Sequence, residues 1–350
     1  MNNNLIEVYI FNFNGRNTIL STIESLLKSV NVNISISIID DYSADDSLEL
    51  VRKSFPEIKI HIMPHNTKKL NLLRNKALGL GKSALVFITD NDLNFDNNCL
   101  SELSKVMESD SSIATCTPRL MHWDQPEKVY TAGTKVHYIG AAISEQRDKI
   151  YDPTNDKLPS SNSGGGICLI RRDAAVKVGG FDEKMLMGWG DDGEFYQRLL
   201  RAGYKCLYIP NAFALHENKI VDTIRKYRVV GQTYNRWLFI LSHYSILLIL
   251  LLLPVFIIYE LVQAVFVLTK GVLAEYVQGN LLVFKKFREV LDKRKFVQSI
   301  KIKSDKEVMF SGELYVAPAL LKKFGFIKTA IGGLSSFLNV YWQIVTKIIP

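Results

Sequence analysis

Two carboxylates follow a buried-strand pattern and could bind a metal ion. Ala84 to Thr89 form an unbroken apolar, β-branched run as long as a buried parallel strand, and the run stops at Asp90-Asn91-Asp92. Ligands of open α/β sheets bind at the carboxyl ends of the strands. Carboxylates there can hold a divalent cation, which can bridge substrate phosphates. A solvated turn would show the same residues, so both interpretations stay open at this point.

Two further acidic clusters could share this chemistry. Asp40-Asp41 follow a strand pattern at Ile34 to Ile39, and Asp191-Asp192 open a predicted helix. Because Asp40 and Asp90 follow strands of one parallel sheet, we expect them at the same edge. Asp40 could accept a hydrogen bond from the imide N–H of uracil or thymine. In the third cluster, a carboxylate could take the proton of an attacking hydroxyl, which typically contributes about 10² to 10⁴-fold. Ordinary turn and helix-terminus acids are the alternative.

Two basic side chains and a glycine triplet complete the candidates. His216 leaves a predicted strand at Cys206 to Ile209 and could be a third metal ligand or a phosphate donor, although a lone histidine is often structural. Arg74 could meet phosphate as a fork of donors, or could be a solvated surface arginine. Gly164 to Gly166 is no phosphate loop, since no Gly-Lys-Ser/Thr follows, and indicates tight backbone packing instead.

The elements that must position these residues alternate between strand and helix. This alternation predicts an α/β fold with a mostly parallel central sheet and helices on both faces. The strands are expected at 5–11, 34–39, 58–63, 84–89, 113–117, 167–170 and 206–209, and the helices near 17–30, 48–51, 70–80, 173–178 and 191–201. Residues 110–163 show a looser pattern, which we interpret mostly as connections that shape a pocket.

The motifs resemble those of family-2 glycosyltransferases with the A-type fold. The nucleotide-binding half of that family is matched by the runs 11–15, 39–45, 74–75 and 90–92. The acceptor half is matched by 164–172, 179–182 and 191–203. The motifs occur in the family's order and cover about residues 5–218. The resemblance is specific as to fold and reaction type, and much less so as to sugar.

The resemblance also implies roles for single residues. It assigns the nucleotide to Asn12, Phe13, Asp40, Arg74 and Asp90, with Asp40 on the base, Mg²⁺ or Mn²⁺ to Asp90, Asp92 and His216, and the catalytic base to Asp192 with its neighbour Asp191. Two departures matter. The family's usual Glu-Asp is Asp191-Asp192 here, and His65 to Leu73 lacks the glycines often found before the arginine.

Net charge, cysteine spacing and the N-terminal residues indicate which partners and which cellular compartment to expect. The net charge of +8 could suit nucleic acid, but much of the basic excess lies beside an apolar C-terminal stretch, which favours a membrane and no nucleic acid. The four cysteines are widely separated and show no metal-ligand spacing, so we expect reduced core residues. The N-terminus lacks a signal-peptide pattern, and we expect the catalytic part to be cytoplasmic.

The C-terminal third predicts a helical, membrane-associated region. It contains a hydrophobic run at 237–268, a basic amphipathic segment at 270–306 and a second hydrophobic stretch at 327–349. The first run exceeds one hydrocarbon core of ~30 Å, and the basic flanks favour one side for both ends. Pro254 could make the run re-entrant, or its pieces could lie on anionic lipid, so spanning, re-entry and surface binding stay open.

These features together predict a membrane-associated, metal-dependent inverting glycosyltransferase. It would transfer a hexose or deoxyhexose from a nucleoside-diphosphate sugar to a glycan or lipid-linked acceptor at the cytoplasmic face of the cell membrane. The catalytic domain is expected at 1–218 and the helical region at 219–350. The tail resembles that of rhamnosyltransferase-like members of the family. A non-catalytic nucleotide-sugar-binding scaffold is the alternative, and the oligomeric state is left open.

Overall fold

A computed structural model describes residues 5–154, 160–161, 164–187, 190–217, 225–312 and 325–350. The chain forms two compact units. The first, called the sheet unit here, comprises Met1–Thr134, Glu145–Met185 and Gly203–Asp222, and the second, called the helical unit, comprises Lys135–Ser144, Leu186–Ala202 and Thr223–Pro350. The division predicted after residue 218, into a catalytic domain and a membrane-associated region, stays a prediction.

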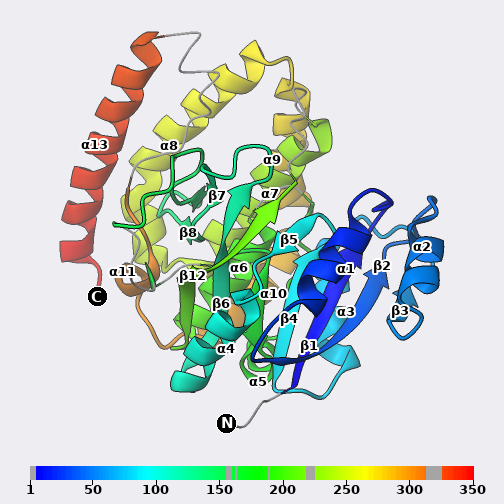
Figure 1. Cartoon of the computed structure of the whole chain (residues 1–350). Coiled ribbons are helices and arrows are strands. Elements are labelled where there is room, and N and C mark those ends of the chain that lie inside the picture. Colours follow the sequence, from blue (N-terminus) through cyan, green and yellow to red (C-terminus); the bar gives the residue numbers. More distant parts are fainter. Residues whose placement is uncertain (1–4, 155–159, 162–163, 188–189, 218–224, 313–324) are drawn as a thin grey trace. The chain divides into compact units, whose positions relative to one another are not determined.

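One mixed sheet forms the centre of the sheet unit (Figure 1). Its main path runs through β10 (Ser160–Ser161), β12 (Lys205–His216), β6 (Ile113–His122), β11 (Cys168–Arg171), β4 (Leu85–Asp90), β1 (Leu5–Asn12), β2 (Asn33–Asp40) and β3 (Lys59–Ile62). Strands β3, β2, β1 and β4 are parallel neighbours, and β11 runs antiparallel between β4 and β6. This arrangement confirms the predicted mostly parallel α/β sheet.

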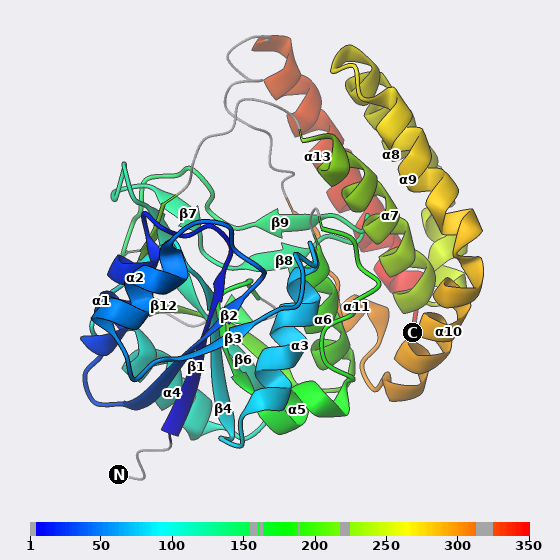
Figure 2. The ribbon, with the colours of Figure 1, turned by 90° about the vertical axis from the view of Figure 1, so that its right-hand side faces the viewer.

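Helices cover both faces of this sheet (Figure 2). One face carries α1 (Ile19–Leu27), α2 (Ser47–Ser54) and α4 (Cys99–Ser109), and the other carries α3 (Leu70–Leu80) and α5 (Arg172–Lys177). Alternate residues of β1, Ile6, Val8 and Ile10, are fully buried in the core shared with α1, α2 and α4. Side chains of a strand alternate between faces, so this spacing selects the core face of β1.

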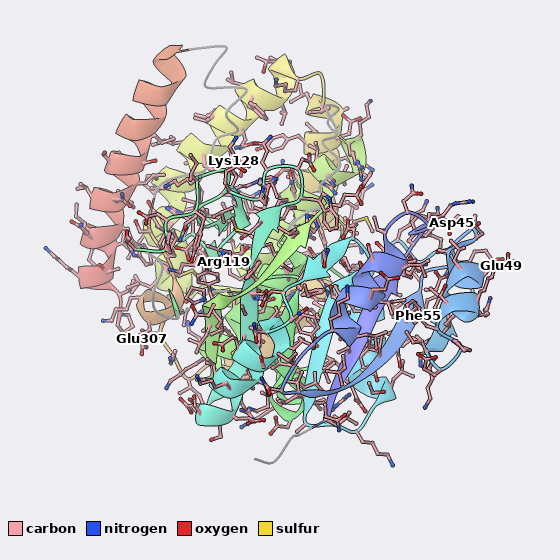
Figure 3. All side chains as sticks on the ribbon, viewed as in Figure 1. Asp45, Glu49, Phe55, Arg119, Lys128 and Glu307 are labelled. Atoms are coloured by element: carbon pink, nitrogen blue, oxygen red, sulfur yellow. The ribbon has the colours of Figure 1, made fainter. Side chains whose placement is uncertain are left out.

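The sheet unit differs from expectation beyond residue 117 and at the end of β12. Strand β6 continues to His122 and pairs with β7 (Val129–Thr131), although this region was expected to hold mostly connections. Strand β12 continues to His216, whereas a strand ending at Ile209 was predicted. The register against β6 shifts between Ile209 and Phe213, which hides the continuation from a search for simple alternation. Arg119, marked in Figure 3, donates to the Pro210 carbonyl at 2.7 Å within this irregular stretch.

The helical unit consists mainly of helices. Its main elements are the short β8 (Thr134–Val136) and β9 (Ala142–Ser144) pair, α6 (Asp191–Arg201), α7 (Lys226–His243), α8 (Ile246–Thr269), α9 (Leu273–Lys285), α10 (Phe287–Ile300), α11 (Asp305–Val308) and α13 (Gly325–Ile348). Helix α7 packs against α9 and α10, and α8 packs against α9 and α13. Helices α8 and α9 run side by side in Figure 2.

The predicted hydrophobic run at 237–268 is divided between two helices. Helix α7 ends at His243, and Ser245 caps α8 by accepting a hydrogen bond from the Leu248 N–H at 3.2 Å. Within the described residues, α8 is the one helix long and apolar enough to cross a membrane, with 24 residues and a mean hydropathy of 2.5. Only 22% of its most apolar window is buried, whereas the core helix of a soluble protein would be mostly buried.

Candidate active site

Asp40 organises the loop that follows β2. Its carboxylate is fully buried and accepts hydrogen bonds from the Asn12 amide at 2.7 Å, the Ser43 hydroxyl at 2.6 Å and the Ser43 N–H at 2.8 Å. An ionised carboxylate offers about four acceptor positions, so three of them are used within the protein. The role of Asp40 on the base stays a prediction, and the structure shows its role in the loop.

Hydrogen bonds also connect the loop after β2 to the loop after β1 and to the segment before α3. Asp41 accepts hydrogen bonds from the Thr67 N–H at 2.8 Å and the Lys68 N–H at 3.2 Å, which fixes the segment before α3. Phe13, the residue after β1, is half exposed, so its ring is available to a ligand. Its role in nucleotide binding also stays a prediction. Asp45, marked in Figure 3, accepts a hydrogen bond from the Arg16 N–H at 2.9 Å. This bond links the loop after β2 to the loop after β1.

An amide pair joins the acidic loops after β2 and β4. In the parallel register Asn12 lies opposite Asp40, and Phe11 lies opposite Asp90. The Asn91 amide donates to the Asn12 side-chain oxygen at 2.5 Å, while Asn12 itself donates to Asp40. The first two acidic clusters therefore share one edge of the sheet, as their positions after parallel strands predict.

His216 lies beside Asp92 although the two residues are far apart in the sequence. The His216 Nε2 is 3.6 Å from an Asp92 carboxylate oxygen, and the Glu217 N–H donates to the Asp92 carbonyl at 3.0 Å. The His216 ring packs on Tyr130 with centroids 4.4 Å apart. Burial lowers the pKa of His216, and the negative charge of Asp90 partly opposes this effect. The lowered pKa favours the neutral imidazole, which is the form that binds a metal ion.

The residues after β4 fit a metal site that a substrate completes. His216 Nδ1 is buried and has no hydrogen-bond partner within the part of the chain that the structure describes. Among those same residues, no three His, Cys, Asp or Glu side chains form a ready metal cage. Mg²⁺ at phosphate sites is usually held by one or two carboxylates together with substrate phosphates, so a closed cage is not required. Asp90, Asp92 and His216 supply suitable donor types for such a partial site.

A pocket of about 210 Å³ adjoins Asp92 in the sheet unit. Its other lining residues are Asn17, Thr18, Ser21, Trp123 and Glu217. Three of these begin α1 or immediately precede it, and helix N-termini favour phosphate groups because their first N–H groups lack helical partners. Sequence reasoning did not single out Trp123 or Glu217 as site residues. The available signals were the position of Glu217 beside His216 and of Trp123 in a segment expected to shape a pocket.

Arg74 fixes a neighbouring segment. Its side chain is buried, donates to the Asn71 side chain at 2.8 Å and lies 5.2 Å above the Phe181 ring. Asn75 donates to the Phe181 carbonyl at 2.8 Å. The Arg74-Asn75 motif on α3 therefore contacts the Gly-Gly-Phe-Asp motif at residues 179–182. The interpretation of Arg74 as a solvated surface residue was wrong, because its side chain is buried against Asn71 and Phe181. A direct contact with phosphate stays a prediction.

The predicted tight packing at the glycine triplet is confirmed at Gly165. A Cβ atom there would lie 2.5 Å from the Thr117 hydroxyl, which is closer than real Cβ atoms approach. Thr117 is buried in β6 and donates to the Ile167 carbonyl at 2.7 Å, so it has little freedom to move away. Gly165 therefore allows its backbone to pass close to the Thr117 side chain.

The third acidic cluster lies in the helical unit, at the start of α6. Asp191 and Asp192 are partly exposed, and Asp192 accepts from the Gly193 N–H at 2.8 Å. Gly190 enters the helix with φ 81°, a left-handed conformation that favours glycine. Gly188 and Trp189, which precede it, lie outside the described residues. That this cluster shares one crevice with Asp92 stays a prediction.

A buried ion cluster holds α6 from within the helical unit. The Glu194 carboxylate lies 2.6 Å from Arg198 Nε, 3.1 Å from Lys293 Nζ and 3.2 Å from His243 Nε2. Burial alone would raise the pKa of Glu194, but Arg198 and Lys293 outweigh burial and hold that pKa well below its usual range. Sequence reasoning missed this cluster, because only the Glu194–Arg198 spacing of four residues signals a shared helix face.

The sequence and the structure both resemble those of known glycosyltransferases. Residues 7–179 match the family described as glycosyl transferase family 2, and residues 145–222 match the N-terminal domain of galactosyltransferase. A crystal structure of GalNAc-T7 with UDP, GalNAc and Mn²⁺ shares the fold, with a TM-score of 0.57 and 16% identity over 70% of this chain and 49% of that chain.

Two curated bacterial proteins are related in sequence. The O-antigen chain rhamnosyltransferase WbaN of Salmonella anatum is 25% identical over 55% of this chain and 59% of its own length. The UDP-Glc:alpha-D-GlcNAc-diphosphoundecaprenol beta-1,3-glucosyltransferase WfaP of Escherichia coli is 33% identical over 25% of this chain and 35% of its own length. The chain thus spans less than two thirds of either relative. Its sheet, its acidic strand ends and these matches agree, and residues 7–179 belong to glycosyl transferase family 2.

Proposed function

We propose that the chain is a metal-dependent inverting glycosyltransferase. It transfers a hexose or deoxyhexose from a nucleoside-diphosphate sugar to a glycan or lipid-linked saccharide at the cytoplasmic face of the membrane. One observation carries the proposal: Asp92 lies 3.6 Å from the partly buried His216 and opens onto a pocket, at the strand ends where this fold binds ligands. The family membership of residues 7–179 supports the reaction class.

Asp90, Asp92 and His216 would hold the cation beside the diphosphate of the donor. Mg²⁺ or Mn²⁺ supplies charge stabilisation that is stronger in the transition state than in the ground state, as negative charge grows on the leaving diphosphate. The Asn12–Asn91 pair keeps the β1 and β4 loops together, and Asp40 keeps the β2 loop in shape for the base. The half-exposed Phe13 ring offers a surface to the nucleotide.

Asp192 receives the proton of the acceptor hydroxyl, with Asp191 as the neighbouring candidate. The hydroxyl oxygen forms a bond to the anomeric carbon on the face opposite the diphosphate, and the bond from that carbon to the phosphate oxygen breaks. The configuration inverts because attack and departure occur on opposite faces. A general base at this position typically contributes about 10² to 10⁴-fold.

The relatives suggest the acceptor class. One is named as an O-antigen chain rhamnosyltransferase, and the name of the other contains a diphosphoundecaprenol-linked acceptor. A lipid-linked acceptor also suits a chain with an exposed, 24-residue apolar helix. We therefore place the reaction at a membrane surface, with a lipid-linked saccharide as the preferred acceptor.

Nucleotide binding and turnover test the proposal separately. UDP-, GDP- and dTDP-sugars are screened for thermal stabilisation with and without Mn²⁺, and the stabilising donor is then tested for transfer or hydrolysis. Asp92→Asn should weaken metal-dependent nucleotide binding by roughly a hundredfold, because it removes a charged ligand. Asp192→Asn should leave that binding intact and lower turnover by about 10² to 10⁴-fold. Full turnover in both variants would refute the mechanism, and binding without any turnover would favour a scaffold.

A further inference from the structure

Helix α8 presents a continuous apolar stripe to the outside. Its members recur every three or four residues and are 44% to 65% exposed, and they are Ile246, Leu250, Leu253, Ile257, Leu261, Val265 and Leu268. This spacing places them on one side of the helix. A soluble protein rarely exposes so long a contiguous apolar surface, which marks a partner or a membrane.

Residues that border this stripe bind α8 to its own unit. Glu260 of α8 forms an ion pair with Arg236 of α7 and accepts a hydrogen bond from the Tyr276 hydroxyl of α9. The Arg236 guanidinium also lies 4.1 Å from the Tyr259 ring centroid. On the other flank, the Tyr341 hydroxyl of α13 donates to the Leu251 carbonyl at 2.5 Å. Helix α8 is therefore attached to α7 and α9 near Glu260 and to α13 near Leu251.

These attachments argue against α8 crossing the bilayer. At 1.5 Å per residue, α8 measures about 36 Å and is long enough to cross, whereas α9 measures only about 20 Å. Glu260 lies near the middle of α8, so crossing would carry the Glu260–Arg236 pair to the centre of the hydrocarbon. Charged groups there are costly. Breaking the pair instead would leave two unpaired charges, so neither route to crossing is favourable.

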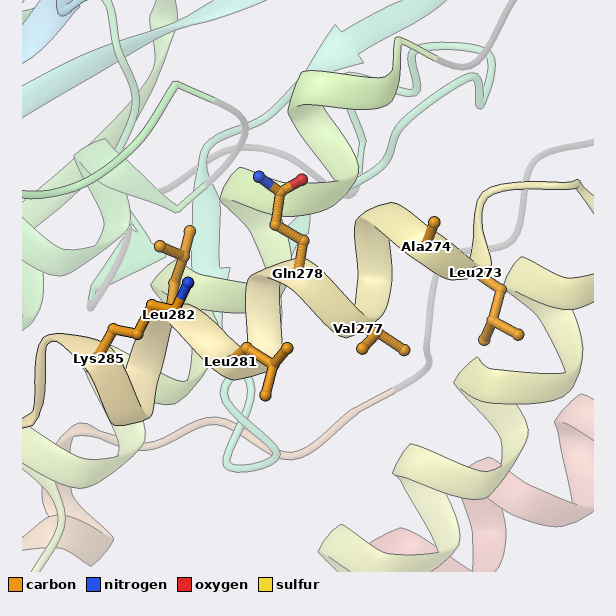
Figure 4. A pocket seen from close by; sticks show the side chains of 7 residues that line it. All are labelled: Leu273, Ala274, Val277, Gln278, Leu281, Leu282 and Lys285. Atoms are coloured by element: carbon orange, nitrogen blue, oxygen red, sulfur yellow. The ribbon is translucent and has the colours of Figure 1, made fainter.

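Helix α9 adds a second apolar surface and is firmly held. Gly279 packs on α7 so closely that a Cβ atom would lie 2.7 Å from the Thr233 Cβ and 2.8 Å from the Val230 carbonyl. The outer side of α9 exposes Val277, Leu281 and Phe284. Figure 4 shows Val277 and Leu281 on one side of α9 and Gln278 on the opposite side, around a hollow of about 500 Å³.

Exposed cations accompany these surfaces. Lys270 follows the end of α8, Lys285 ends α9, and Arg288 and Lys295 lie on α10, all exposed. Exposed Phe287 and Leu291 lie among the cations of α10. A basic surface with interspersed apolar side chains suits the interface of an anionic bilayer, where each cation near the surface strengthens binding roughly fivefold.

We propose that α8, α9 and α10 dock the protein on one leaflet of an anionic bilayer, with α8 lying in the membrane plane. The stripe of α8 reaches the acyl chains, and the cations of α9 and α10 meet the headgroups. The inference rests on the membrane location in the proposed function and specifies its mode as surface docking rather than spanning. It also keeps the polar inner sides of α7 and α9 out of the hydrocarbon.

A labelling experiment separates docking from spanning. Cysteine is introduced at one of two positions that mark the two ends of α8. Lys270 lies just after the C-terminal end of α8. Ile302 is 79% exposed and marks the N-terminal end, because it is close in sequence to Asp305, whose carboxylate accepts a hydrogen bond from the Ser245 N–H at 3.0 Å. The full chain is added to sealed vesicles of phosphatidylcholine and phosphatidylglycerol and treated with a membrane-impermeant maleimide. The native chain, whose four cysteines are buried, gives the background. Equal labelling at both positions is expected, and labelling of one position only after detergent would overturn the proposal.

Vesicle flotation tests the surface itself. Leu250→Ser with Leu261→Ser should lower the partition coefficient roughly a hundredfold, at about tenfold for each leucine. Ile150→Ser removes an isoleucine of the sheet unit that is 71% exposed, and as the matched control it should change nothing. Lys285→Gln with Arg288→Gln should weaken binding roughly 30-fold on anionic vesicles and leave neutral vesicles unaffected. Unchanged flotation of both double variants would overturn the proposal, whereas lost turnover with intact flotation would count only against the proposed reaction.

Discussion

The strongest single prediction concerns the buried Glu194 in α6. Glu194→Gln keeps the side-chain shape and removes one negative charge, which leaves Arg198 and Lys293 as close cations without their carboxylate. Lys293 is only 8% exposed, so water cannot replace the lost partner. Removing one member of a buried ion pair typically costs about 3 to 5 kcal/mol. We expect the free energy of unfolding to fall by about that amount.

A second substitution makes the prediction specific to the cluster. Lys293→Met removes the ammonium and keeps an unbranched apolar chain, so it should also destabilise the native protein by leaving Glu194 with one cation fewer. In the Glu194→Gln background the lysine has already lost the Glu194 carboxylate, so the same change should cost less than it does in the native chain. The double-mutant cycle should give a coupling of roughly 2 kcal/mol, within the range for residues of one network.

Urea unfolding followed by circular dichroism measures all four proteins. The slope of the transition is compared as well as its midpoint, because a changed slope would indicate a changed unfolded or native state. The control is Lys295→Met, which removes an exposed lysine of the same helix and should alter stability by less than about 0.5 kcal/mol. A Glu194→Gln variant within 1 kcal/mol of the native chain, or strictly additive effects, would refute the reasoning.

The remaining predictions follow from the same contacts. Stability should fall as the pH drops from about 6.5, because burial lowers the pKa of His243 from 6.5 to about 3 and the unfolded chain binds the proton first. The depressed pKa of Glu194 adds to this loss below pH 4.5, and pH-dependent unfolding of Glu194→Gln should lack that part. Gly165→Val should destabilise the sheet unit by about 1 to 3 kcal/mol, since its first added carbon already meets Thr117 at 2.5 Å, and thermal unfolding measures the loss. If Arg74 contacts phosphate, Arg74→Met should reduce the free energy of nucleotide binding more than it reduces the free energy of unfolding. Calorimetry measures the first quantity and urea denaturation measures the second.

Sequence patterns within short segments predicted much of the fold. Apolar runs of strand length, each followed by a helical segment, predicted β1, β2 and β4 within one or two residues of their observed bounds. Parallel strands place their carboxyl ends together, so the positions of Asp40 and Asp90 at one edge also followed from the sequence. Such features depend on side-chain alternation within short segments, and neighbouring residues suffice to show them.

The site depended on contacts between distant segments. His216 reaches Asp92 only because β12 resumes after an irregular stretch at Pro210 and pairs again with β6 and with β5 (Leu93–Phe95). Glu194 is buried only because α7 and α10 bring His243 and Lys293 to it. No periodicity within one segment indicates these pairings.

The sequence by itself therefore determined the order of strands and helices, the acidic strand ends and the apolar character of the C-terminal third. The tertiary structure decided that the Asp40 carboxylate accepts hydrogen bonds from Asn12 of β1 and from Ser43, that Asp92 acquires a histidine neighbour, and that Glu260 ties α8 to α7 and α9. The physical reason is that burial and pairing of charged groups depend on which distant segments pack together. Packing is set by the whole chain, whereas helix and strand patterns are set within a few residues.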